Sequence, residues 1–214
     1  MIRSLKHFIN SFEICLNSLK QPNRKFPREG LTWPKVIRFL SLPFCPVRLE
    51  TLFAVRRFEE IPPARLLAEG IQGVLLDADG TLGPDQVRTF PESSVQHVLK
   101  LQQSGLRVGI FTNADESRFG QFEGVIAAKK VSAKPDVKGF FEAMKQTLEL
   151  DNPSRVCMVG DNYVTDGGAV DAGMMFVYVK PIEGRESVVN RWLKKWGCFW
   201  AKIHGKIVWL ESFP

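Results

Sequence analysis

The middle of the chain alternates between short apolar runs and segments in which apolar residues recur at helical spacing. A parallel sheet is covered by helices on both faces, so its strands read as continuous apolar runs. The pattern predicts strands at 73–76, 107–111, 125–127, 155–159 and 175–179. It predicts helices at 62–70, 91–104, 115–121 and 136–149. Strands that alternate with helices in this way predict an α/β fold, with a parallel sheet and helices on both of its faces.

The two ends of the chain carry a different pattern. Residues 3–20 predict an amphipathic helix with a basic polar side, and residues 21–34, which hold three prolines and a glycine, predict a linker. An apolar stretch follows at 36–42. Residues 186–204 predict a second basic helix, whose apolar stripe comprises Trp192, Trp196, Phe199, Trp200 and Ile203. The pattern divides the chain into an N-terminal extension and linker, a core, and a basic Trp-rich tail: 1–59, 60–182 and 183–214.

Charge follows the same division. The formal net charge of the chain is +6. Residues 1–70 hold 12 Lys/Arg against 6 Asp/Glu, residues 71–179 hold 10 against 14, and residues 180–214 hold 7 against 3. Basic ends are typical of proteins that meet an anionic surface, and an acidic centre can hold a cation. The alternative is that these charges only solvate exposed helices.

Several functional classes find no support in the sequence. No apolar run has the ~18–20 residues that a membrane-spanning helix needs, and the start of the chain does not predict a secretory signal. The four cysteines are scattered without a C-x-x-C pair, which favours a reducing compartment over a disulfide framework. The three histidines are also scattered, so neither a histidine zinc site nor a Ser-His-Asp triad is expected.

Polar residues with catalytic chemistry follow the predicted strands. They form four groups along the chain: Asp77 to Thr81, Thr112-Asn113, Lys134-Pro135 and Gly160 to Asp166. Ligands bind beyond the carboxyl ends of the strands in such sheets, so these groups are expected to converge. Of two carboxylates one residue apart, one can attack phosphorus while the other transfers the proton. A lysine can neutralise the phosphoryl group, and further carboxylates suit a hard octahedral cation.

The order of these groups resembles the haloacid dehalogenase (HAD) superfamily over about residues 60–182. The resemblance implies Asp77 as nucleophile and Asp79 as general acid and base. It implies Thr112 and Lys134 as phosphate-binding residues. Asn113 is added from the sequence itself, because Thr112-Asn113 after the strand can supply a hydroxyl and backbone N–H groups to phosphate oxygens. The resemblance also implies Mg²⁺ as cofactor, held by Asp77, by Asp161, by the backbone carbonyl of Asp79, and by Asp166 directly or through water. A proton-donating aspartate at position 79 favours phosphatase over dehalogenase activity.

The spacing leaves no room for a cap domain. Only 30 residues lie between Thr81 and Thr112, and 21 lie between Thr112 and Lys134. We therefore expect an open site, which suits a phosphate carried by something large. The chain has a Gly-Asp-x-x-x-Thr-Asp stretch at 160–166, the lead-in Ile71-Gln72-Gly73, and a basic tail after the last strand. With these features it looks like the small capless YqeG-type branch of the superfamily. Mitochondrial relatives of that branch dephosphorylate phosphatidylglycerophosphate, so the resemblance implies a phospholipid phosphate as substrate.

The Trp-rich basic tail bears on location. Tryptophan with lysine and arginine is typical of a helix that lies at a membrane interface, so the tail predicts an anionic membrane surface as partner. The expected location is cytoplasmic, peripheral on the inner face of a membrane, on the matrix side if the source is eukaryotic. Alternatively, the apolar stripe of this helix packs against the N-terminal segment and is part of the core. Basic aromatic stretches also bind single-stranded nucleic acid, but no nucleic-acid partner is expected because no recognised module accompanies this one.

Two other functions stay open from the sequence. The first is a soluble HAD phosphatase that acts on a nucleotide, a sugar phosphate or a phosphoprotein. The second is a non-catalytic HAD-fold docking protein. The intact set of Asp77, Asp79, Lys134 and Asp161 argues against the docking protein, because a binding module would not need all four together.

Overall fold

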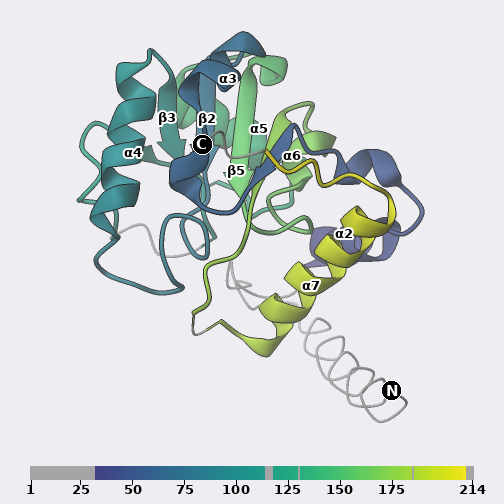
Figure 1. Cartoon of the computed structure of the whole chain (residues 1–214). Helices are drawn as coiled ribbons and strands as arrows, with labels where there is room; N and C mark the ends of the chain where they lie inside the picture. The colour runs from purple at the N-terminus through teal and green to yellow at the C-terminus, as the bar shows by residue number, and fades with distance from the viewer. Residues whose placement is uncertain (1–31, 114–117, 130, 185, 211–214) are drawn as a thin grey trace.

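The protein is an α/β structure built on one parallel sheet (Figure 1). The computed structural model describes residues 32–113, 118–129, 131–184 and 186–210. In this part of the chain the sheet has six strands in the order β1-β6-β5-β2-β3-β4, and every pairing is parallel. The strands are β1 Phe53–Val55, β2 Gly73–Leu76, β3 Arg107–Ile110, β4 Ile126–Ala127, β5 Val156–Gly160 and β6 Met175–Val179. The five predicted strands are confirmed, and the fold class with them.

The helices agree with the predicted pattern where they can be compared. They are α2 Trp33–Ser41, α3 Pro63–Ala68, α4 Glu92–Gln103, α5 Val137–Ala143, α6 Gly168–Asp171 and α7 Val188–Ile203. Short 3₁₀ turns lie at Pro46–Leu49 (η1), Phe58–Glu60 (η2) and Pro153–Arg155 (η5). The predicted helix 136–149 continues from α5 into a π-helical turn, Met144–Leu148 (η4). The predicted helix 3–20 lies outside the described residues, as does most of the predicted helix 115–121.

The sheet is buried on both faces. Leu75 of β2 and Met158 of β5 face a core formed with α5, α6 and α7. Their neighbours Leu76 and Val159 face a second core formed with α3 and α4. Each core residue of these strands is at most 1% exposed, because side chains of successive strand residues point to opposite faces and helices cover both. This explains why the strands read as continuous apolar runs.

One strand lies outside the predicted core segment 60–182. The three residues of β1 pair with β6 at one edge of the sheet, and Ala54 also forms a parallel bridge with Trp209. Both segments that flank the predicted core therefore contribute to the sheet. The strand β1 is too short, and its partner β6 lies too far along the chain, for the sequence pattern to predict it.

The Trp-rich helix α7 packs on the protein along one side. It lies beside α2, where the Trp196 ring stacks on Phe39 at 4.8 Å and Trp196 Nε1 donates to the Phe39 carbonyl at 2.9 Å (Figure 1). Trp200 also packs against the core. Trp192, Phe199 and Ile203 stay 46–56% exposed. The predicted stripe is thus divided between a packed side and an exposed side. Among the described helices, none combines the length and the apolar character that crossing a membrane requires.

No cap domain interrupts the described part of the core. The segment between Thr81 and Thr112 holds α4 and β3, and the described residues between Thr112 and Lys134 hold β4. The absence of an inserted cap agrees with the spacing argument. The carboxyl ends of the strands are nevertheless covered in part by α2 and α7.

Candidate active site

Three neighbouring strands bring the predicted polar residues to one edge of the sheet. The central strand β2 lies between β3 and β5, at the point where the chain order in the sheet reverses. Asp77 follows β2, Thr112 follows β3 by one residue, and Asp161 follows β5 directly. The backbone N–H of Asp77 still donates to Val159 in β5 at 2.9 Å, which fixes the start of the loop. Such a reversal point is where open α/β sheets bind ligands.

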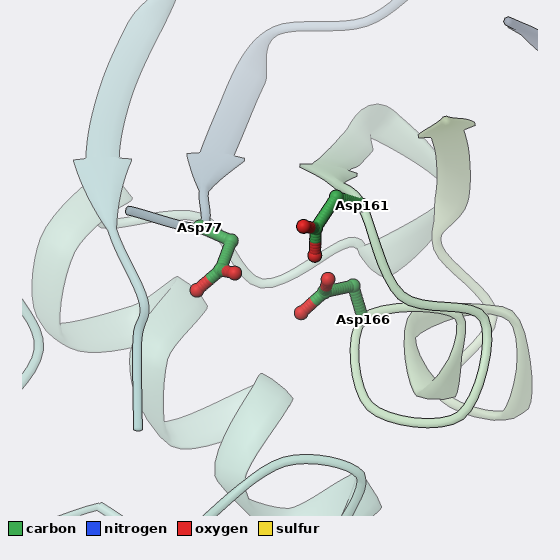
Figure 2. Close-up of side chains that lie close together, drawn as sticks. All are labelled: Asp77, Asp161 and Asp166. Carbon is green, nitrogen blue, oxygen red and sulfur yellow. The ribbon is translucent and has the colours of Figure 1, made fainter. Parts of the chain in front are cut away.

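Three carboxylates meet at this edge. Asp77, Asp161 and Asp166 each offer an oxygen within 4.8 Å of the others (Figure 2). The residues are 8%, 1% and 0% exposed. Buried like charges at such distances repel strongly unless cations neutralise them. The cluster therefore requires positive charge nearby.

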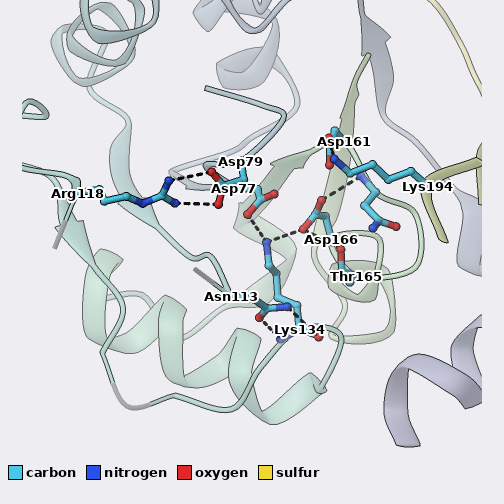
Figure 3. A network of polar contacts seen from close by, with 10 residues as sticks. Asp77, Asp79, Asn113, Arg118, Lys134, Asp161, Thr165, Asp166 and Lys194 are labelled. Atoms are coloured by element: carbon cyan, nitrogen blue, oxygen red, sulfur yellow. Dashed lines mark hydrogen bonds and ion pairs between the residues drawn. The ribbon is translucent and has the colours of Figure 1, made fainter. Parts of the chain in front are cut away.

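Lys134 supplies part of that charge. Its Nζ lies 2.7 Å from Asp77 Oδ1 and 2.6 Å from Asp166 Oδ1, and it links the two carboxylates (Figure 3). Burial alone would lower the pKa of Lys134, but Asp166 and Asp77 outweigh it and raise that pKa. The lysine is therefore a fixed cation at the position where a phosphoryl group would meet Asp77.

Lys194 supplies the rest, and the sequence analysis did not assign it to the site. In the sequence it is one of several basic residues of the predicted helix 186–204. In the structure it is 7% exposed, and its Nζ lies 2.6 Å from Asp161 Oδ2 and 3.1 Å from Glu186 Oε2. Burial alone would lower its pKa, but Asp161 outweighs this and raises it. Lys194 thus points from α7 into the active site, and no sequence signal separated it from the other lysines of that helix.

Gly80 makes the close approach of these groups possible. Its φ of +83° is one that residues with a side chain rarely adopt. A Cβ at this position would lie 2.1 Å from Asp161 Oδ2 and 2.8 Å from Lys194 Nζ. The glycine therefore keeps the Asp77–Asp79 loop against the Asp161–Lys194 pair.

Asp79 lines the same cavity but stands outside the three-carboxylate cluster. Arg118 holds both of its oxygens, with NH1 3.1 Å from Oδ1 and NH2 2.8 Å from Oδ2. The backbone N–H of Gln86 donates to Oδ1 at 2.9 Å. A bidentate pair of this kind fixes both position and orientation. Arg118 is a second site residue that the sequence analysis missed, because it lay inside a predicted helix without a motif around it.

Thr112 and Asn113 both line the cavity, although Asn113 is engaged elsewhere. Asn113 Oδ1 accepts the backbone N–H of Lys134 at 3.0 Å, and its Nδ2 donates to the Lys134 carbonyl at 3.4 Å. This pair of bonds ties the loop after β3 to the loop that carries the lysine. Asn113 therefore positions Lys134, and direct contact of Thr112 or Asn113 with phosphate stays a prediction.

Burial and mutual repulsion raise the pKa of the central carboxyl groups. The pKa of Asp77 is raised to about 6, first by burial and then by Asp166, with Lys134 acting in the opposite direction. The pKa of Asp161 is raised well above its ordinary value, again first by burial, and Lys194 opposes the shift. Perturbed carboxyl groups in a cavity are typical of active sites.

The residues present fit a divalent cation. Asp161 Oδ1 is buried without a hydrogen-bond partner, whereas Oδ2 lies 2.6 Å from Lys194 Nζ. Buried acceptors without donors are costly unless something else satisfies them. Oxygen ligands from Asp77, Asp161 and Asp166 are the set that Mg²⁺ prefers.

Magnesium binding is expected to weaken as the pH falls below about 6. Only the ionised form of Asp77 can ligate a cation, and its pKa is raised to about 6, so Mg²⁺ must displace a proton below that pH. The dissociation constant should rise by at least about tenfold per pH unit there and level off above it. Calorimetric titration of the protein with MgCl₂ at a series of pH values on both sides of pH 6 measures the dissociation constant. Equal affinity at about pH 5 and pH 7 would contradict the assignment of Asp77 as a ligand.

The cavity over these groups holds about 230 Å³, and α2 and α7 form part of its wall. Lys35 of α2 lines it, as do Ser187, Asn190 and Lys194 at the start of α7. Glu186 lines it just before that helix. The expectation of an open site therefore needs a correction: no cap is inserted in the described core, yet α7 and α2 cover one side.

Comparison with known proteins supports this interpretation. A family model described as haloacid dehalogenase-like hydrolase matches residues 82–173. The match covers less than half of the chain. The match begins just after the Asp77–Thr81 loop and includes Thr112, Lys134, Asp161 and Asp166. The match supports the prediction of a HAD-type hydrolase, and the roles assigned to these residues stay predictions.

Two solved structures are similar to part of the chain, at low identity and low TM-score. One is the core domain of a proposed phosphoglycolate phosphatase from Streptococcus pneumoniae TIGR4, 14% identical, covering 56% of this chain and 92% of its own, with a TM-score of 0.38. The other is CbbY from Rhodobacter sphaeroides in complex with phosphate, 14% identical, covering 55% and 89%, with a TM-score of 0.39. No curated protein matches the chain. Structures at these scores indicate nothing about the function of this protein.

Proposed function

We propose that the protein is a Mg²⁺-dependent phosphomonoester hydrolase that acts through an aspartyl-phosphate on a phospholipid phosphate, such as phosphatidylglycerophosphate, at a membrane surface. The observation that carries the chemistry is the position of Lys134. Its Nζ joins Asp77 to Asp166 at 2.7 and 2.6 Å, within the buried three-carboxylate cluster. A purely structural cluster would not need a nucleophile, a cation and unsatisfied acceptors at one strand edge.

The residues divide the reaction between them. A carboxylate oxygen of Asp77 attacks phosphorus, and the bond from phosphorus to the ester oxygen breaks. Asp79 gives its proton to that leaving oxygen, then takes a proton from the water that attacks the aspartyl-phosphate. Inorganic phosphate leaves and Asp77 is restored. Lys134 neutralises Asp77 and the phosphoryl oxygens throughout. Bound Mg²⁺ would offset the negative charge that gathers on those oxygens.

An exposed apolar face on α2 and α7 supports a lipid substrate. On α2, Trp33, Ile37 and Leu40 are 56–59% exposed and recur at helical spacing. On α7, Trp192, Phe199 and Ile203 are 46–56% exposed. We call these six residues the α2–α7 apolar face. Exposed apolar groups on this scale are typical of protein or membrane contact surfaces. Both helices also wall the active-site cavity, so a surface that meets this face would lie beside the site.

Exposed basic residues of α7, namely Arg191, Lys195 and Lys202, favour an anionic membrane, whereas Lys35 and Arg38 of α2 are buried. Each Lys or Arg near an anionic leaflet contributes about 1 kcal/mol, which falls off within ~10 Å at moderate salt. Together with the apolar face they would give reversible, salt-sensitive attachment. The inner face of a membrane stays the predicted location on this ground.

Vesicle binding tests the lipid proposal. The wild type is expected to bind phosphatidylglycerol vesicles at low salt, to release them at high salt, and to bind neutral vesicles weakly. A variant with Trp33→Ser, Ile37→Ser and Leu40→Ser should lose about tenfold or more in vesicle affinity. Its hydrolysis of p-nitrophenyl phosphate should stay unchanged. Co-sedimentation and phosphate release measure the two properties.

A matched control separates the face from general loss of apolar surface. Leu67, Leu99 and Ile126 are 41–50% exposed and lie on other parts of the chain. Replacing these three by serine should leave vesicle binding intact. If the wild type ignores anionic vesicles at low salt and hydrolyses a soluble phosphomonoester efficiently, the lipid proposal fails. The soluble phosphatase then takes its place.

A further inference from the structure

Asp79 is held by hydrogen-bond donors from two separate segments of the chain. Arg118 Nη1 and Nη2 lie 3.1 and 2.8 Å from its Oδ1 and Oδ2 (Figure 3). The backbone N–H of Gln86 donates to the same Oδ1 at 2.9 Å. The side chain of Asp79 is 20% exposed, so a carboxylate that solvent reaches nevertheless keeps a fixed direction.

The turn after Asp79 provides one side of this arrangement. The N–H of Gly80 donates to the Gly83 carbonyl at 2.8 Å, and Asp79 and Gly83 form an isolated bridge. Gln86 then has a φ of +61°, which residues with a side chain uncommonly adopt. The chain thereby folds back and brings the Gln86 N–H to Asp79. This turn holds Oδ1 alone, whereas the donor to Oδ2 is Arg118.

Arg118 is itself fixed in place. Its Nη1 also donates to the Val87 carbonyl at 3.1 Å, and its guanidinium carbon lies 5.7 Å from the centroid of the Phe119 ring. Phe119 is buried and packs against Phe90, with 5.8 Å between the ring centroids. The Arg118 side chain is 11% exposed. A planar guanidinium held in this way loses little freedom when it binds both oxygens of a carboxylate.

We propose that Arg118 is the positioning residue for proton transfer by Asp79. This inference rests on the proposed phosphatase function and adds a residue that the HAD resemblance did not supply. As an Asp77 oxygen bonds to phosphorus, the bond from phosphorus to the ester oxygen breaks and Asp79 gives that oxygen its proton. In the second step Asp79 takes a proton from the attacking water. A carboxyl group transfers a proton only within hydrogen-bond reach of its partner, so the direction that Arg118 gives to Asp79 governs both steps.

The dependence on the leaving group tests this role. The substrates are phenyl phosphate, whose leaving oxygen needs a proton, and p-nitrophenyl phosphate, whose leaving group departs without one. In Arg118→Met, kcat/KM for phenyl phosphate is expected to fall at least about tenfold further than kcat/KM for p-nitrophenyl phosphate. The two substrates are of similar size, so a distorted cavity would slow both alike. Phosphate release over a range of substrate concentrations measures the two values.

The second step gives an independent readout. With p-nitrophenyl phosphate, kcat of Arg118→Met should fall while kcat/KM stays within about threefold of wild type, because kcat/KM reports on formation of the aspartyl-phosphate and kcat also includes its hydrolysis. Phosphorylated enzyme should therefore accumulate. Acid quench and mass spectrometry of the Asp77 peptide detect it. Arg118→Lys should show the same pattern with a smaller loss, because an ammonium reaches the carboxylate but cannot bind both oxygens in the same way.

A double variant shows whether Arg118 acts through Asp79. In the Asp79→Asn background, Arg118→Met should change the rate of the p-nitrophenolate burst by no more than about twofold, since the group that it positions is already lost. Arg88→Met is the control of equal charge change. Arg88 is an exposed arginine of the same loop, and its replacement should leave the ratio of the two kcat/KM values unchanged.

The outcomes separate the inference from the proposed function. The inference is overturned if Arg118→Met slows both substrates by the same factor or slows neither. It is also overturned if the variant has an undiminished effect in the Asp79→Asn background, because Arg118 then only holds the loop. Circular dichroism checks the fold, and Arg118→Lys decides the question if the methionine variant does not fold. Failure of the proposed function gives a different result, in which the wild type releases phosphate from neither substrate.

Discussion

The Asp77→Asn variant is expected to release phosphate at least about a thousandfold more slowly than the wild type while it keeps its fold. An amide oxygen is a poor nucleophile, so the aspartyl-phosphate cannot form. The fold should survive, because the substitution is isosteric and removes one of three buried carboxylates that repel one another. Lys134 keeps Asp166 as its partner at 2.6 Å. Phosphate release from p-nitrophenyl phosphate, together with circular dichroism, measures the two expectations.

Asp79→Asn is the informative companion to that variant. It leaves the nucleophile in place but removes the group that activates water, so phosphorylated enzyme should accumulate. Acid quench followed by mass spectrometry detects the added phosphoryl group on the Asp77 peptide. Asp151→Asn changes an exposed aspartate that precedes β5, at the edge of the sheet opposite the site, and should behave as wild type. If Asp77→Asn retains more than a trace of turnover under saturating Mg²⁺, the covalent route through Asp77 is wrong.

The catalytic aspartates could be predicted from the sequence because their signal is local. Each lies at or near the end of an apolar run, and the runs are continuous because the parallel sheet is buried on both faces. A strand pattern and the residues that follow it are enough to place Asp77 and Asp161 at one sheet edge. Lys134 was found by its place in the order of the motifs, and the structure brings its Nζ to Asp77.

The contributions of the terminal segments could not be predicted, because they depend on partners far along the chain. Lys194 resembles any lysine of an amphipathic helix until α7 packs on the core and turns it toward Asp161. The strand β1 has only three residues, and its partner β6 lies more than a hundred residues later. Arg118 meets Asp79 across 39 residues. Nothing in the local pattern distinguishes such residues from solvent-exposed ones.

Arg38 is the clearest example of this kind. The sequence analysis placed it within an apolar stretch of the N-terminal extension, whereas the structure buries it to 2% exposure in α2. Its guanidinium pairs with Asp171 and donates to the carbonyls of Tyr163 at 3.1 Å and Gly167 at 2.5 Å. These carbonyls belong to the loop between Asp161 and α6, which carries Asp166. Arg38 therefore holds the loop that completes the carboxylate cluster.

Arg38→Met is accordingly expected to lower the free energy of unfolding by about 3–5 kcal/mol. The methionine fills part of the space but leaves Asp171 without its buried partner and the loop carbonyls without a donor. Phosphatase activity of the folded fraction should also fall, because the position of Asp166 beside Lys134 depends on that loop. Urea unfolding followed by circular dichroism gives the stability, and activity per folded molecule gives the second effect.

Arg48→Met is the matched control for that variant. Arg48 also approaches Asp171, at 3.4 Å, but its side chain is 33% exposed and it donates to no carbonyl of the Asp161–Asp166 loop. A pair of this kind contributes at most about 1 kcal/mol. Combining Arg38→Met with Asp171→Asn should recover part of the lost stability, because it removes the carboxylate left unpaired, while the carbonyls stay unsatisfied. If Arg38→Met lowers the free energy of unfolding no more than Arg48→Met does, then α2 covers the core but does not hold the Asp161–Asp166 loop. The Asp161–Asp166 loop must in that case hold its shape through its own hydrogen bonds, of which Asn162 N–H to Asp166 Oδ2 at 3.0 Å is the first to test.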